Sequence, residues 1–292
     1  MKKWLSLLCG VMVAVFIWCG NVSAQGQIKV VRNYAKPGEV MYHTGLTKEQ
    51  IGGAKYALLP GDPGRVEALA KAMGPAKYVG NHRDFTSWLT SVNGQPVLVM
   101  STGMGGPCIT FAVEELARLG VTNFIRVGTC GSLQEDLNIG DVVINKAAVR
   151  EDGASKAYAP IEYPAVADLD ITLALRQAAQ ELKVPFKVGI TVSTDSFWPG
   201  QERHDGFRNY VPRSLQGSLQ EWQALNCTNF EMEAATLFVV SNAFGLRSGC
   251  ICGVMATRTH SEAVDSRDAY LLGQERFQRV TKRALEILLA QK

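Results

Sequence analysis

Short apolar runs alternate with helical patterns along most of the chain. Runs rich in β-branched and apolar residues, typical of strands, lie at 56–59, 96–100, 123–127, 141–144, 188–192 and 249–255. Several are apolar on both faces, which is typical of central strands. Between them, apolar residues recur at helical spacing over 63–73, 107–119, 171–182, 232–244 and 267–290. This alternation predicts one α/β domain with a largely parallel sheet covered by helices on both sides.

The amino terminus follows a different pattern. Lys2 and Lys3 precede an uncharged apolar run at 4–20, and small residues lead to Ala24. This pattern predicts a secretory signal peptide over 1–24, cleaved after Ala24. A membrane anchor is the competing interpretation, but the run is short for a membrane span. We therefore expect an exported protein, periplasmic or secreted, without a stable membrane span after cleavage.

Composition excludes one class of protein and says little of metals. The chain has 30 Lys and Arg against 27 Asp and Glu, a balance too even for a nucleic-acid binder held by phosphate contacts. Cysteines outside the leader are odd in number, and the chain is too large to need disulfides. Cys250 and Cys252 alternate with apolar residues and have no nearby His for a zinc site, so we expect them to be buried as small hydrophobic residues.

Two glycine-rich segments follow predicted strands, where ligands collect in α/β sheets. The segment 60–65 reads Pro-Gly-Asp-Pro-Gly-Arg and opens a helix, whose amino end attracts anions. A purely structural turn is an equally ordinary interpretation of this segment. The segment 101–107 reads Ser-Thr-Gly-Met-Gly-Gly-Pro. Its glycines are costly in chain entropy, which favours a ligand loop over a structural turn.

A third segment, 126–132, places Arg126 near the end of an apolar strand, followed by glycines and Thr129. A buried guanidinium needs an anion, and the sequence offers no obvious internal carboxylate partner. We expect Arg65 and Arg126, with the Gly61 backbone and the Thr129 hydroxyl, to form a phosphate cradle. Walker and dinucleotide patterns are missing, so inorganic phosphate is the expected anion.

The fourth segment, 230–235, carries two carboxylates just before a predicted helix. A carboxylate can accept hydrogen bonds from two adjacent ribose hydroxyls, and Met232 offers an apolar floor for the sugar. The competing interpretation is an ordinary helix start, where acidic residues favour the helix dipole.

Together these segments resemble a known family. Residues 61–63, 101–107, 126–131, 197–203 and 231–233 are similar, in order and spacing, to the uridine phosphorylases of the nucleoside phosphorylase family. The similarity begins at about residue 41, which leaves an extension over 25–40 and a domain over 41–292. It implies a single domain with a central mixed, mostly parallel sheet flanked by helices. It also implies a homohexamer built as a trimer of dimers.

The resemblance implies reversible phosphorolysis of uridine to uracil and ribose 1-phosphate, with inorganic phosphate as co-substrate and no cofactor. The residues that it assigns to phosphate are Gly61, Arg65, Arg126 and Thr129, joined by Arg83 of a neighbouring subunit. Those assigned to ribose are Met104, Met232 and Glu233, joined by His43 of a neighbouring subunit. Those assigned to the base are Phe197, Gln201, Arg203 and Phe230. The residues expected to contribute most to catalysis are Arg126, Thr129, Glu233 and Arg258, the last by supporting the leaving base.

The chain departs from this family at a cation site. Bacterial relatives hold potassium between subunits on a Glu and a Ser, but Asp84 and Cys108 stand at the matching positions. A thiol is a poor ligand for a hard cation, so we expect no metal.

Two alternatives remain open. A purine nucleoside phosphorylase or nucleosidase shares the fold, but residues 256–259 lack the Asp that such relatives present to the purine. The second alternative is an exported, non-catalytic nucleoside-binding protein. The arginines at the phosphate positions argue against it, because such a protein has no need to bind phosphate.

Overall fold

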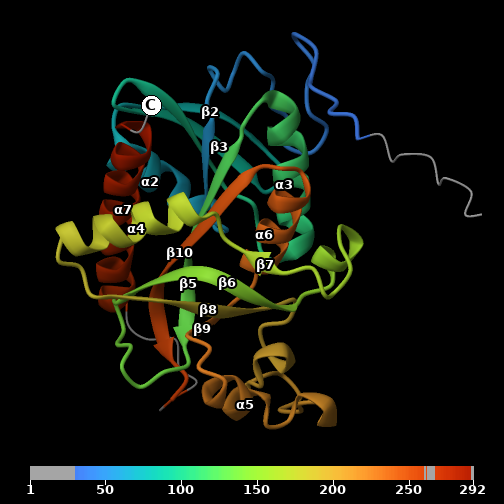
Figure 1. The fold of residues 1–292 in the computed structure, drawn as a ribbon, viewed down its shortest axis with the longest axis vertical. Helices are drawn as coiled ribbons and strands as arrows, with labels where there is room; N and C mark the ends of the chain where they lie inside the picture. Colours follow the sequence, from blue (N-terminus) through green and yellow to red (C-terminus); the bar gives the residue numbers. More distant parts are fainter. Residues whose placement is uncertain (1–29, 260, 262–266, 291–292) are drawn as a thin grey trace, which may run out of the picture. The chain divides into compact units, whose positions relative to one another are not determined.

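A mixed sheet runs through the structure, a computed structural model that describes residues 30–259, 261 and 267–290 (Figure 1). The sheet and its helices belong to one unit that begins at Tyr34. The predicted signal peptide over 1–24 lies outside the described residues. The strands are β1 (Tyr56–Leu59), β2 (Ala76–His82), β3 (Phe85–Val92), β4 (Gln95–Met100), β5 (Asn123–Ser132), β6 (Val142–Glu151), β7 (Ala165–Val166), β8 (Phe186–Thr194), β9 (Asn229–Glu231) and β10 (Arg247–Thr257).

Helices cover both faces of the sheet, as the alternating pattern predicts (Figure 1). They are α2 (Val66–Met73), α3 (Gly106–Leu119), α4 (Leu169–Glu181), α5 (Ser218–Ala224), α6 (Ala234–Ala243) and α7 (Arg267–Ala290). One hydrophobic cluster contains side chains of α3 and α6, and a second contains side chains of α2, α4 and α7. No helix in the described part of the chain combines the length and apolar character needed to cross a membrane.

Each predicted strand and helix is present, so the α/β prediction is confirmed. Among the elements that were not predicted are β2, β3, β7 and α5. Strand β2 is mostly exposed, and β3 mixes Thr, Ser and Trp with apolar residues. Cys250 and Cys252 are fully buried, as expected.

Strand β5 lies at the centre of the pairing scheme. It pairs in parallel with β1 and β10, and its last residues pair antiparallel with β9. Strand β10 also pairs with β6, β6 with β8, and β8 with β9. These pairings close β5, β10, β6, β8 and β9 into a ring of hydrogen-bonded neighbours. The closed ring places the end of β9 and the start of α6 beside the second half of β5.

Candidate active site

A cavity of about 750 Å³ opens where β1, β4, β5 and β9 end. It is lined by residues from all four of the segments singled out in the sequence. The predicted site residues that line it are Gly61, Arg65, Met104, Arg126, Thr129, Phe197, Gln201, Arg203, Phe230, Met232 and Glu233. The fold therefore gathers side chains that are far apart in the sequence around one space.

The two glycine-rich loops form one wall of this cavity. The N–H of Gly103 donates to the carbonyl of Gly61 at 3.0 Å, and the N–H of Thr102 donates to the carbonyl of Pro60 at 3.0 Å. A Cβ on Gly61 would lie 3.0 Å from the Gly103 carbonyl oxygen. A side chain at position 61 would crowd the facing loop, so glycine favours this close approach, and Gly61 and Gly103 both line the cavity.

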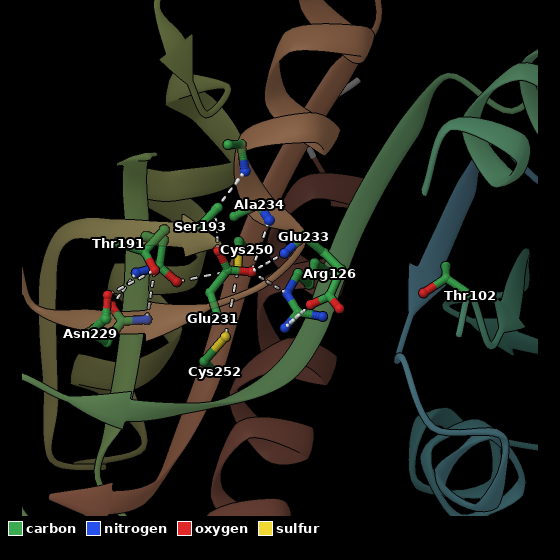
Figure 2. Close-up of polar contacts among 12 residues, drawn as sticks. Thr102, Arg126, Thr191, Ser193, Asn229, Glu231, Glu233, Ala234, Cys250 and Cys252 are labelled. Carbon is green, nitrogen blue, oxygen red and sulfur yellow. Dashed lines mark hydrogen bonds and ion pairs between the residues drawn. The ribbon is translucent and has the colours of Figure 1, made fainter. Parts of the chain in front are cut away.

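Arg126 lines the cavity and lies between two carboxylates (Figure 2). Its Nε is 2.9 Å from Oε2 of Glu231, and its Nη2 is 2.5 Å from Oε2 of Glu233. Arg126 was expected to lack an internal carboxylate partner, and this expectation was wrong, because Glu231 and Glu233 both pair with it. Glu231 is the last residue of β9, which pairs directly with the end of β5, and Glu233 directly precedes α6.

Glu231 is more than an ion-pair partner. Its Oε2 also accepts hydrogen bonds from the N–H groups of Glu233 and Ala234, both at 2.8 Å. Its Oε1 accepts from the Ser193 hydroxyl. The N–H groups at the beginning of α6 have no partner within the helix, so this carboxylate caps α6 as well as pairing with Arg126.

Burial and charge act against each other in this cluster. Burial raises the pKa of the Glu231 carboxyl to about 7, although Arg126 opposes the rise. Burial disfavours the charged form of Arg126, but Glu233 and Glu231 outweigh it and raise the pKa of the guanidinium. Arg126 therefore keeps its positive charge in the cavity lining.

Glu233 connects Arg126 to the second glycine-rich loop. Its Oε1 accepts a hydrogen bond from the N–H of Gly105 at 2.6 Å, while its Oε2 pairs with Arg126. Gly105 has a φ of 91°, a left-handed conformation that favours glycine. The loop before α3, the start of α6 and strand β5 are thus joined at one carboxylate.

Aromatic and basic side chains also line the cavity. The guanidinium of Arg203 stacks on the Phe197 ring at 4.1 Å, and Gln201 is almost fully buried in the 3₁₀ turn Pro199–Gln201. Arg258 does not line the cavity. Nη1 of Arg258 donates to the carbonyl of Gln201 at 3.0 Å, so Arg258 holds the turn that carries Gln201.

His43 and Arg83 also lie outside the cavity of their own chain. Nδ1 of His43 is 2.8 Å from Oε1 of Glu115, and its ring stacks on Phe111. Arg83 lines a separate cavity of about 550 Å³ and lies over the Tyr42 ring. Neither side chain reaches the Arg126 site within its own subunit.

Asp84 and Cys108 do line the main cavity. A Cβ built on Gly103 would lie 3.3 Å from the Cys108 sulfur and 3.4 Å from Cβ of Asp84, so the two side chains are neighbours. Within the described residues, no group of three or more His, Cys, Asp and Glu is arranged to hold a metal ion.

Comparison with known proteins agrees with this arrangement. Residues 55–289 match the model of the phosphorylase superfamily. The chain belongs to the phosphorylase superfamily. It is 50% identical to the uridine phosphorylase of Haemophilus influenzae and 48% identical to that of Escherichia coli, each over 76% of this chain and 88% of the relative. It is 46% identical to the uridine phosphorylase of Thermococcus kodakarensis, over 81% of this chain and 85% of the relative.

Sequence reasoning missed two features of this phosphorylase site. The first is the pairing of Glu231 with Arg126 and its capping of α6. The signal in the sequence was a second carboxylate two residues before Glu233. The second is the space at Gly128, where a Cβ would lie 2.8 Å from Cζ of Arg126. Gly128 is therefore required for the guanidinium to lie along β5 and reach both carboxylates.

We expect Gly128→Ala to displace the Arg126 guanidinium and lower the free energy of unfolding by about 1–3 kcal/mol, as in other overpacked sites. Urea titration measures this loss. Gly80→Ala is the matched control, since Gly80 also lies in a strand but a Cβ there would meet no atom within 4 Å. Gly80→Ala should stay within about 0.5 kcal/mol of the unaltered protein. Equal losses in the two variants would contradict the packing argument.

Proposed function

We propose that this protein catalyses the reversible phosphorolysis of uridine to uracil and ribose 1-phosphate. The observation that carries the proposal is the cavity that Arg126 and Glu233, an ion pair, line together with Gln201 and Arg203. Relatives that are 46–50% identical over most of their length are named uridine phosphorylases. The cavity thus combines a cationic floor, a hydroxyl-binding carboxylate and an aromatic side in one space.

Phosphate is held at the floor of the cavity. Arg65 and Arg126 supply charge, and the Gly61 backbone and Thr129 hydroxyl supply further donors. All four residues line the same cavity. Arg83 of a neighbouring subunit completes this set, which agrees with its position outside the cavity of its own chain. Inorganic phosphate is the co-substrate, and no other cofactor is required.

The nucleoside lies above the phosphate. Glu233 and Met232 hold the ribose, with Met104 at the mouth of the cavity and His43 of a neighbouring subunit at the sugar. Gln201 and Arg203 pair with the polar edge of uracil, while Phe197 and Phe230 supply apolar contacts. Arg258 supports the base through its hydrogen bond to the Gln201 carbonyl.

The reaction is a displacement at the anomeric carbon of the ribose. A phosphate oxygen forms a bond to this carbon as the bond to uracil breaks, and the bonding electron pair leaves with the base. The sugar passes through an oxocarbenium-like state that the adjacent phosphate stabilises, while Arg203 faces the charge that develops on uracil. No side chain acts as the nucleophile. Catalysis consists of holding phosphate and ribose in line and stabilising the separated charges.

The test of this function is incubation of the protein with uridine, with and without phosphate. We expect uracil release only with phosphate, and a much higher kcat/KM for uridine than for cytidine or inosine. Cytidine lacks the N3 hydrogen and O4 of uracil, and a site built around such bonds rejects a mismatched analogue by orders of magnitude. Release without phosphate would indicate a hydrolase, comparable turnover of inosine a purine enzyme, and binding without turnover a nucleoside-binding protein.

We also propose a homohexamer, a trimer of dimers, whose sites are shared between two subunits. If Arg83 acts in the neighbour's site, Arg83→Ala and Arg126→Ala should each be nearly inactive alone. In a mixed dimer one site carries both defects and the other carries neither. Random reassociation yields mixed dimers about half the time, so roughly 25% of the original activity should return after co-refolding. If subunit exchange is demonstrated and no activity returns, then either both arginines act in the site of the same subunit or Arg83 does not bind phosphate.

Export to the periplasm or the medium is the third part of the proposal. It is supported by the basic start, the uncharged run at 4–20 and the small residues before Ala24. Amino-terminal sequencing of the protein recovered outside the cytoplasm should begin at Gln25. An intact Met1 on active protein in the cytoplasmic fraction would refute this prediction.

A further inference from the structure

Glu231 belongs to none of the substrate-binding sets described above, yet it contacts two of them. It is 3% exposed, and its carboxylate lies against Arg126 on β5 and the backbone N–H groups of Glu233 and Ala234. Arg126 serves phosphate and Glu233 serves ribose in the proposed reaction. Both substrate sites therefore depend on the position of one buried carboxylate.

The geometry restricts how Arg126 can lie. Glu231 occupies the Nε edge of the guanidinium and Glu233 contacts Nη2, so two anchors on one rigid plane define its orientation. Gly128 leaves the space in which this plane rests. Without the Glu231 anchor, the ion pair with Glu233 is the one that would remain to Arg126 among the described residues, and Glu233 serves ribose in the proposed reaction.

We propose that Glu231 is a positioning residue that holds the Arg126 guanidinium in the orientation that binds phosphate. The proposal rests on the proposed function, in which Arg126 is a phosphate ligand. Glu231 lines the same cavity, but in this role it acts on phosphate through Arg126 and transfers no proton. Its negative charge orients Arg126, and its oxygen fixes the backbone that carries Glu233.

The charge on Glu231 depends on its surroundings. The titratable groups that face it are Arg126, Cys130, Glu233, Cys250 and Cys252, and Ser193 donates a hydrogen bond from β8. Burial, the largest effect, raises the pKa of Glu231 to about 7. The orienting charge is therefore present above about pH 7 and is lost as the pH falls below it.

The decisive variant is Glu231→Gln, which keeps the shape of the side chain and removes its charge. Glutamine retains an oxygen that can accept from the N–H groups of Glu233 and Ala234, so the ribose side is preserved. We expect the KM for phosphate at about pH 8 to rise about tenfold, while the KM for uridine changes less than about threefold. Ser193→Ala is the control, because it removes the hydrogen bond to the other oxygen of Glu231 and leaves the charge. Its KM for phosphate should stay within about twofold.

The pH profile separates positioning from a general loss of structure. The ratio of the phosphate KM of Glu231→Gln to that of the unaltered protein should fall toward one between about pH 8 and about pH 6. Taking the ratio at each pH cancels the titration of phosphate itself. A constant ratio, or equal rises in the two KM values, would overturn the positioning role.

A binding measurement decides the question without turnover. Phosphate should raise the melting temperature of the unaltered protein, because it binds only the folded state. This rise should shrink by at least about half in Glu231→Gln and persist in Ser193→Ala. An equal rise in Glu231→Gln would overturn the proposal, as would no rise in the unaltered protein. If the protein shows these melting shifts but releases no uracil, uridine phosphorolysis is refuted and the positioning role of Glu231 stands.

Discussion

A buried positive charge is the constraint on which this structure depends. Arg126 is 5% exposed, and an unpaired guanidinium at that depth would be strongly destabilising. The chain meets this constraint with Glu231 and Glu233, which lie two residues apart and contact different nitrogens of the same side chain. The arrangement requires β9 to end beside β5 and α6 to begin at once. It also requires a residue without a side chain at Gly128.

The same constraint prepares the site for its proposed chemistry. Arg126 is oriented before any ligand arrives, so little reorganisation is needed when phosphate binds. Glu233 links this cation to the loop at Gly105, so the proposed ribose and phosphate sites share one support. Arg258 supports the proposed base site by its hydrogen bond to the Gln201 carbonyl. Preorganisation of charges, with no side-chain nucleophile, is what the proposed displacement requires.

Local pattern was sufficient to predict much of this protein. Apolar periodicity located the strands and helices of the α/β domain, and the glycine-rich segments after strands identified the loops that line the cavity. Exposed strands such as β2 lack that apolar signal and were missed. The pairing of Arg126 with Glu231 was missed for a different reason. It depends on the closure of β5, β10, β6, β8 and β9 into a ring, which no short stretch of sequence encodes.

The central claim is that phosphate, held by Arg126, is the nucleophile. Phosphorus NMR of a reaction that contains uridine and excess phosphate tests it most directly, with uracil measured in the same sample. The account predicts one equivalent of ribose 1-phosphate for each uracil released, and loss of both products in Arg126→Ala. Free ribose in place of the phosphate ester, or undiminished ester formation in Arg126→Ala, would contradict it.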